Sequence, residues 1–188
     1  SVPNSPKGVK LIDLDSDTKP EIVVARQMTN KISVFPNTSS SGSVSFGSRI
    51  DYTNGPANNT GRPEKVYGAD LNGDGKPEIL VANAGSWGQP GTIISVLENT
   101  SSTSGISFES YFGVSTGSGP HGIAAVDIDG DNHIDILTAN YKDTKFSTIL
   151  QIPNYAPVAS AGTVTTNEDT DYTGTLSAAD VDGDALTY

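Results

Sequence analysis

The chain has 188 residues, a length that fits one domain or two small ones. Its 22 acidic and 11 basic residues give a formal net charge of -11, which argues against nucleic acid as a partner because phosphate contacts need clustered Lys and Arg. Cysteine is absent, which excludes disulfides and thiolate metal sites, and no apolar run approaches the ~20 residues of a membrane span. The 20 glycines and 11 prolines predict short strands and turns rather than helices.

Three copies of one pattern follow each other at a fixed spacing of about 57 residues. They read LIDLDSDTKPEIVVAR (11–26), GADLNGDGKPEILVAN (68–83) and AVDIDGDNHIDILTAN (125–140). In every copy a proline lies seven residues before the first aspartate and an alanine lies twelve residues after it. Repetition at this period indicates a fold built from one supersecondary unit.

Short apolar runs separated by turn residues predict the strands of each unit. A first run precedes the acidic loop, and a second follows it at 22–25, 79–82 and 136–139. Third runs are expected at 32–35, 93–97 and 148–152, each followed by an asparagine (Asn37, Asn99 and Asn154). A fourth run, at 44–46 with 49–52 and at 106–112, closes the first two copies only. The pattern predicts an all-β fold, a partial β-propeller of three four-stranded blades; a solenoid is the alternative.

The acidic loops, at 13–21, 70–78 and 127–135, carry oxygen-bearing side chains at their first, third, fifth and ninth positions. The backbone carbonyl of the seventh residue can add a further oxygen. Ca²⁺ prefers six to eight hard oxygen ligands, so the loops predict calcium sites, whereas Mg²⁺ needs a tighter octahedral cage. The candidate ligands are Asp13, Asp15, Asp17, Lys19 and Glu21; Asp70, Asn72, Asp74, Lys76 and Glu78; and Asp127, Asp129, Asp131, His133 and Asp135.

Three other interpretations of these loops fit the sequence less well. An EF-hand needs a bidentate Glu at position twelve, where this chain has Val24, Val81 and Thr138. Dockerin-type loops are disfavoured for the same reason. Polar turns without a cation remain an alternative, but clustered carboxylates without a cation would repel one another and lose hydration.

The motif D-x-[DN]-x-D-x-x-x-[DE], followed by Ile and a short apolar strand, resembles the FG-GAP or VCBS-type repeat over about residues 1–154. The resemblance implies a calcium-binding β-propeller similar to the head of integrin α subunits. The first loop departs from the pattern because Ser16 and Thr18 stand where glycines are usual. The third loop has Asn132 at one of these positions, and Asn tolerates left-handed backbone angles.

Residues 155–188 do not continue the repeat and contain the segments APVA, NEDT and DVDGDALTY. They resemble the beginning of a bacterial cadherin-like or VCBS-type immunoglobulin-like sandwich. The resemblance implies that interdomain calcium is bound by Glu168, Asp169, Asp180, Asp182 and Asp184. Since the chain opens without a methionine and stops within this pattern, we expect it to be a segment of a longer protein.

Signals for catalysis are weak. His121 and His133 occupy repeat columns that elsewhere hold Lys or Glu, which indicates solvent-facing positions. Trp87, in a Gly-rich stretch, could stack on a sugar ring or pack at a blade rim. We therefore expect a non-enzymatic, calcium-binding structural or adhesive module of a secreted or cell-surface bacterial protein, with carbohydrate or a cell-surface protein as partner. The alternative is a scaffold or carbohydrate-binding part of a secreted polysaccharide lyase or hydrolase.

Overall fold

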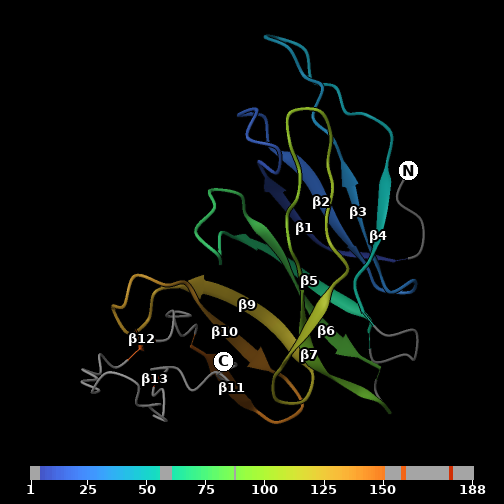
Figure 1. Cartoon of the computed structure of the whole chain (residues 1–188). Helices are drawn as coiled ribbons and strands as arrows, with labels where there is room; N and C mark the ends of the chain where they lie inside the picture. Colours follow the sequence, from blue (N-terminus) through green and yellow to red (C-terminus); the bar gives the residue numbers. More distant parts are fainter. Residues whose placement is uncertain (1–4, 56–60, 87, 151–157, 160–177, 180–188) are drawn as a thin grey trace, which may run out of the picture. The chain divides into compact units, whose positions relative to one another are not determined.

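The computed structural model describes residues 5–55, 61–86 and 88–150, together with the short strands at 158–159 and 178–179 (Figure 1). The chain divides into two compact units, Ser1–Gln151 and Ile152–Tyr188. Every regular element of the described residues is a β-strand, as the all-β prediction requires. None of these residues forms a helix that could cross a membrane.

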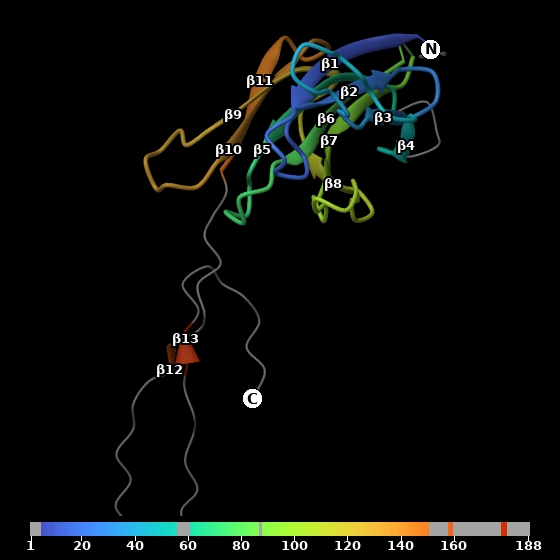
Figure 2. The same ribbon diagram turned by 90° about the horizontal axis from the view of Figure 1, so that it is seen from above.

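The first unit contains three antiparallel sheets, which we call the first, second and third blade (Figure 2). Each sheet follows chain order, so neighbouring strands are joined by hairpins or loops. The first blade comprises β1 (Pro6–Ile12), β2 (Glu21–Arg26), β3 (Lys31–Phe35) and β4 (Ile50–Thr53). The second comprises β5 (Pro63–Ala69), β6 (Glu78–Gly85), β7 (Pro90–Leu97) and β8 (Phe112–Ser115), and the third β9 (Pro120–Val126), β10 (Asp135–Asn140) and β11 (Lys145–Ile149).

The blades pack face to face, so the apolar cores lie between neighbouring sheets. One cluster joins the first and second blades and includes Leu14, Ile32, Ile79 and Val81, all fully buried. A second cluster joins the second and third blades, with Leu80, Ile94 and Ile136 among its members. β6 belongs to both clusters because successive side chains point to opposite faces of a strand. This explains why its sequence is apolar without alternation.

The first strands of the first two blades approach each other very closely. A Cβ atom placed on Gly8 would lie 2.9 Å from the carbonyl oxygen of Glu64 and 2.9 Å from Cα of Lys65. A Cβ on Gly68 would lie 2.8 Å from Cδ1 of Ile12. Both contacts are shorter than van der Waals packing allows. The absence of a side chain at these positions therefore sets the spacing between the two sheets.

The third blade differs from the prediction in the limits of its last strand. Within the described residues it has three strands, in line with a fourth run that closes the first two copies only, so the four-stranded blades are the first two. Its last strand is Lys145–Ile149 rather than 148–152, and Ile149 pairs with Ile136 as Leu97 pairs with Ile79. By this register Gln151, not Asn154, occupies the column of Asn99. The error arose because this strand has polar and apolar residues on both faces, which hides its limits.

The fourth run predicted at 49–52 lies close to β4, whereas the run predicted at 106–112 precedes β8 and overlaps it only at Phe112. Residues 44–46 and 106–108 belong to long loops, and the strands themselves are β4 and β8. Isolated bridges Asn37–Phe46 and Asn99–Phe108 close these loops. In the second of these loops the apolar residues that suggested a strand, Ile106 and Phe108, pack against the first core cluster, whereas Val44 in the first loop is exposed.

The second unit contains β12 (Val158–Ala159) and β13 (Ala178–Ala179), which form an antiparallel pair. The candidate ligands of this region, Glu168, Asp169, Asp180, Asp182 and Asp184, lie outside the described residues. Trp87 and Asn154 also lie outside them.

Candidate metal centres in the acidic loops

Each acidic loop connects the first two strands of a blade. The loops follow β1, β5 and β9, and the ninth residue of each begins the next strand: Glu21, Glu78 and Asp135. They are therefore loops between two antiparallel strands, as the exclusion of an EF-hand requires. All fifteen predicted ligand residues lie within the described part of the chain.

The loop backbone wraps around its own carboxylates in the same way three times. The N–H of the sixth residue donates to Oδ2 of the first: Thr18 to Asp13 (3.0 Å), Gly75 to Asp70 (2.8 Å) and Asn132 to Asp127 (2.9 Å). The N–H of the seventh donates to Oδ1 of the fifth at 2.8 Å: Lys19 to Asp17, Lys76 to Asp74 and His133 to Asp131. These bonds fix the orientation of the first and fifth side chains of each loop. The backbone carbonyl of the seventh residue remains a predicted ligand.

The fourth and sixth residues of every loop have left-handed backbone angles. The φ values are 63° and 71° at Ser16 and Thr18, 75° and 85° at Gly73 and Gly75, and 88° and 70° at Gly130 and Asn132. Glycine and Asn adopt this region readily, whereas a β-branched residue does so at a cost. The first loop thus holds the same conformation as the other two against the preference of its own residues.

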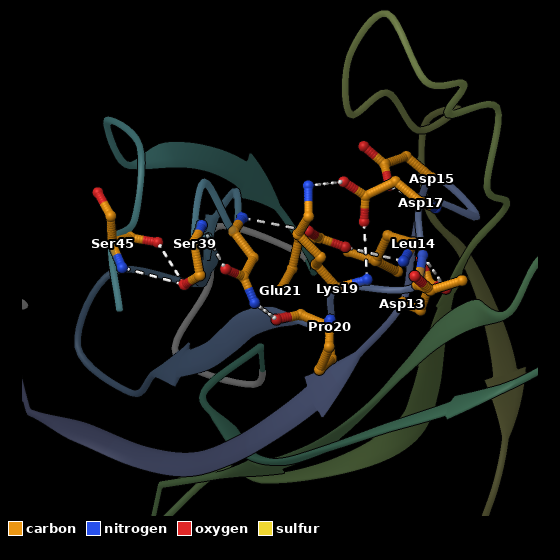
Figure 3. A network of polar contacts seen from close by, with 11 residues as sticks. Asp13, Leu14, Asp15, Asp17, Lys19, Pro20, Glu21, Ser39 and Ser45 are labelled. Atoms are coloured by element: carbon orange, nitrogen blue, oxygen red, sulfur yellow. Dashed lines mark hydrogen bonds and ion pairs between the residues drawn. The ribbon is translucent and has the colours of Figure 1, made fainter. Parts of the chain in front are cut away.

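The ninth residue is a buried anchor. Glu21, Glu78 and Asp135 are 1%, 3% and 0% exposed. Each accepts a bond from the N–H of the loop's second residue: Leu14 to Glu21 (2.9 Å), Leu71 to Glu78 (2.7 Å) and Ile128 to Asp135 (2.8 Å). The other oxygen of Glu21 accepts from the Asn37 N–H at 3.2 Å (Figure 3). Burial raises the pKa of Glu21 and of Glu78, and the N–H donors only partly offset it.

Three carboxylates converge in the first and third loops. Among the described residues, one group whose oxygens lie within 4.8 Å of one another is Asp13, Asp15 and Asp17, and the other is Asp127, Asp129 and Asp135. The second loop has an amide, Asn72, at its third position, and its three acids do not meet this criterion. The second loop therefore has the least concentrated negative charge of the three.

The first loop contains a carboxylate oxygen that fits a cation. Asp13 Oδ1 is buried and has no hydrogen-bond partner, whereas the equivalent oxygens of Asp70 and Asp127 accept from Gly73 and Gly130 at 2.8 and 2.7 Å. A buried oxygen without a partner is costly unless something else satisfies it. Next to it, burial and then the charge of Asp17 raise the pKa of Asp15. These hard oxygens suit Ca²⁺ and offer nothing to a soft metal.

The Asp17 carboxylate also interacts with a lysine. Its pKa is lowered chiefly by the hydrogen bond from the Lys19 N–H, and also by the Lys19 ammonium, whose Nζ lies 3.2 Å from Oδ2 (Figure 3). The pair is exposed, so this contact contributes little to stability. A cation bound between the three aspartates would compete with Lys19 for the same oxygen.

The two histidines do not form a catalytic arrangement with any nucleophile that the structure describes. His121 Nδ1 lies 2.9 Å from the Gly119 carbonyl, and its ring packs against Tyr141 with centroids 5.2 Å apart. His133 Nδ1 lies 3.5 Å from Asp131 Oδ1. Both side chains are partly exposed, as the repeat columns predicted.

A pair of asparagines that follow the third strands was not recognised as functional from the sequence. Asn99 Nδ2 donates to the carbonyl oxygens of Leu14 (2.9 Å) and Pro77 (3.0 Å), so it holds together the acidic loops of two blades. Asn37 Nδ2 donates to the Pro20 carbonyl at 2.9 Å. A signal was present: Asn-Thr-Ser-Ser occurs at 37–40 and again at 99–102.

A scan against protein-family models finds the FG-GAP-like repeat twice, at residues 13–81 and 70–138. Each match runs from the first aspartate of one acidic loop to the second strand of the next blade, so it contains two successive acidic loops. Searches of the curated proteins and of the solved structures gave no match. The two family matches together cover well over half of the 188 residues. The chain therefore belongs to the FG-GAP-like repeat family, and its first unit is a β-propeller-type module.

Proposed function

We propose that the chain is a calcium-stabilised, non-enzymatic structural or adhesive module of a secreted or cell-surface protein, with the acidic loops as its calcium sites. The observation that carries the proposal is the first loop, where Asp13, Asp15 and Asp17 converge and one buried oxygen of Asp13 has no partner. Carboxylates held this close repel one another unless a cation lies between them.

The chain's own residues would orient the ligands and hold the loop in place at such a site. The N–H groups of the sixth and seventh residues orient the first and fifth carboxylates, and the ninth acid fixes the loop to the second strand. Bound Ca²⁺ would supply the positive charge that neutralises these carboxylates. Extracellular calcium modules typically bind in the ~0.1–1 mM range, which suits a protein exposed to millimolar calcium.

Calorimetry on the full chain tests the proposal. Chelator should lower the melting temperature, Ca²⁺ should restore it, and Mg²⁺ should restore it poorly. At a hundredfold excess over the dissociation constant, each occupied site adds ~2.7 kcal/mol to the free energy of unfolding. Equal melting curves with chelator and with millimolar calcium would reject the metal assignment.

Two isosteric variants locate the sites. Asp17→Asn and Asp129→Asn remove one charge from the first and third loops, and each should abolish or weaken one site in a calcium titration. The matched control is Glu109→Gln, which removes a charge from an exposed residue outside the acidic loops. A control variant that lost as much calcium affinity as the loop variants would show that net charge, not a site, attracts the ion.

A further inference from the structure

The sequence contains the dipeptide Asn-Gly twice, at 54–55 and at 72–73. An asparagine that precedes glycine loses its side-chain amide as ammonia more easily than other asparagines do, because glycine has no side chain to shield its backbone nitrogen from the neighbouring amide carbon. The two dipeptides have the same chemistry and opposite surroundings. Asn54 and Gly55 are buried, whereas Asn72 and Gly73 are exposed in the second acidic loop.

The Gly73 nitrogen, which would attack the amide carbon of Asn72, is open to reaction. Apart from the chain neighbours, no described atom lies within 4 Å of a Cβ placed on Gly73. The Gly73 N–H donates to Asp70 Oδ1 at 2.8 Å. A base that removes a proton must lie within hydrogen-bond reach of it, about 2.6–3.2 Å between the heavy atoms. The Asp70 carboxylate is therefore placed to accept the proton that the nitrogen loses.

A second hydrogen bond activates the amide carbon of Asn72. Its side-chain oxygen, Oδ1, accepts from the Asp74 N–H at 3.0 Å. Attack on the amide carbon puts negative charge on this oxygen, and a backbone N–H held about 2.7–3.1 Å away stabilises such charge. The second loop thus places a proton acceptor beside the attacking nitrogen and a donor beside the oxygen that becomes charged.

The surroundings of Asn54 oppose the same reaction. The side chain is 0% exposed, and Nδ2, the nitrogen that would leave, donates to Asn83 Oδ1 at 2.8 Å. Among the described residues, nothing donates to the buried Asn54 Oδ1, so no N–H there would stabilise a negative charge. A Cβ placed on Gly55 would lie 3.1 Å from Cα of Gly61, which shows how closely the backbone is packed.

We propose that Asn72 of the folded protein deamidates by attack of the Gly73 nitrogen, with the Asp70 carboxylate as proton acceptor, and that Asn54 does not. The Gly73 nitrogen forms a bond to Cγ of Asn72 as its proton passes to Asp70. The bond between Cγ and Nδ2 then breaks, and the leaving nitrogen takes up that proton and departs as ammonia. The five-membered succinimide that remains is opened by water at either of its two carbonyl groups, which gives aspartate or isoaspartate.

The two products change the second loop in opposite ways. Aspartate at position 72 would match Asp15 and Asp129 of the other two loops and would add a negative charge to the loop whose acids converge least. Isoaspartate would insert a methylene group into the main chain beside Gly73, which the loop holds at a φ of 75°. If the loops bind calcium, as the proposed function states, aspartate would strengthen the second site and isoaspartate would weaken it.

Peptide mapping by mass spectrometry tests the proposal on the full chain, incubated at neutral pH in chelator. Conversion of the amide to a carboxylate raises the mass of the peptide that carries it, and chromatography separates the isoaspartate form. The folded protein should convert Asn72 and keep Asn54. In urea at a concentration that unfolds the chain, both should convert at similar rates, because both are then the same dipeptide in water.

A matched pair of variants tests the role of Asp70. Asp70→Asn should lower the rate at Asn72 ~10-fold or more in the folded protein and leave the rate in urea nearly unchanged. The control is Asp127→Asn, which makes the same change at the equivalent position of the third loop and should leave the rate at Asn72 as in the wild type. An unchanged rate in folded Asp70→Asn would overturn the assignment of Asp70 as proton acceptor.

The wild type alone keeps the proposal falsifiable, whether or not a variant folds. An intact Asn72 in the folded protein, after both asparagines have converted in urea, would overturn it. Equal conversion of Asn54 and Asn72 in the folded protein would do the same, because the surroundings would then have no effect.

The effect of the modification on the second loop has a separate test. Asn72→Asp reproduces the aspartate product and should bind calcium more tightly than the wild type in a titration, whereas equal affinity would overturn the strengthened second site. A wild type that bound no calcium would reject the proposed function. The conversion of Asn72 is measured in chelator, so that result would leave the deamidation itself standing.

Discussion

Thr18 is held at φ 71°, a backbone conformation that a β-branched residue disfavours. We expect Thr18→Gly to raise the free energy of unfolding by about 0.5–1 kcal/mol, because relief of the left-handed angle exceeds the entropic cost of glycine. Gly75→Ala should lower it by about 1–2 kcal/mol through the backbone alone, since nothing lies within 4 Å of the added methyl. Urea unfolding measures both changes. Thr103→Gly, at an exposed loop residue outside the left-handed region, should destabilise slightly.

Asp51 makes a pH-dependent contribution. Burial raises its pKa, but hydrogen bonds from the Ser33 hydroxyl and the Arg26 guanidinium outweigh this effect, so the pKa lies below its ordinary 3.8. A depressed carboxyl pKa stabilises the fold above the unfolded value, and this stabilisation is lost as the pH falls through the folded value.

We therefore expect Asp51→Asn to destabilise the protein by about 1.5–3 kcal/mol at neutral pH, the usual range for hydrogen bonds to charged groups. The difference from wild type should shrink below about pH 4, where wild-type Asp51 also becomes protonated. Unfolding measured across this pH range checks the prediction. A destabilisation that stayed constant with pH would assign the effect to packing instead of charge.

At the scale of elements, the loops that follow the third strands hold neighbouring hairpins together. Asn99→Ala should cost about 1–3 kcal/mol, because it leaves the Leu14 and Pro77 carbonyls without their donor. Asn37→Ala is the matched variant and should cost less, since Asn37 Nδ2 donates to one carbonyl and lies nearer solvent. Chemical denaturation of the two variants gives the comparison. Equal losses of unfolding free energy in the two variants would mean that the contact of Asn99 with the first blade does not add to stability.

The strands next to the acidic loops could be predicted from sequence because they combine apolar runs with turn residues at a fixed period. For this reason β2 and β6 contain the runs expected at 22–25 and 79–82, and each extends beyond them at both ends. The run expected at 49–52 lies close to β4, but β8 begins later than expected, because Ile106 and Phe108 look like strand residues although they pack on the first core cluster from a loop. β11 begins and ends three residues earlier than expected. Because this strand has no clear apolar face, the sequence does not mark where it starts or stops.

For the site, the sequence predicted the loop positions and the need for left-handed residues. It could not assign the ninth acid to a structural role, since a ligand and a buried anchor have the same side chain. Only the three-dimensional contacts of Glu21 and Glu78 with backbone N–H groups show the anchor. Nor could it show that carboxylates converge more closely in the first and third loops than in the second, because that depends on side-chain direction.

At the scale of the whole molecule, the net charge of -11 is concentrated in part in three loops. In chelator, added NaCl should raise the melting temperature, because salt screens repulsion between exposed carboxylates. In saturating Ca²⁺ the same salt should have a smaller effect, since the ion already neutralises the loops on the proposed function. A differential scanning series in both conditions tests this. Identical salt responses would indicate that the repulsion lies elsewhere on the surface.

The close approach at Gly68 links the packing of two sheets to the chemistry of a loop. A methyl group there would push on Ile12, and Ile12 directly precedes Asp13, whose carboxylate opens the first loop. Gly68→Ala would thus displace Ile12 and, through the backbone, the candidate ligand Asp13, which the added methyl group does not contact. Its signature would be a weaker first calcium site beside an unchanged third one. On the proposed function, the distance between the first two blades would then influence the calcium affinity of the first loop, and a force that separated or compressed these sheets would change that affinity.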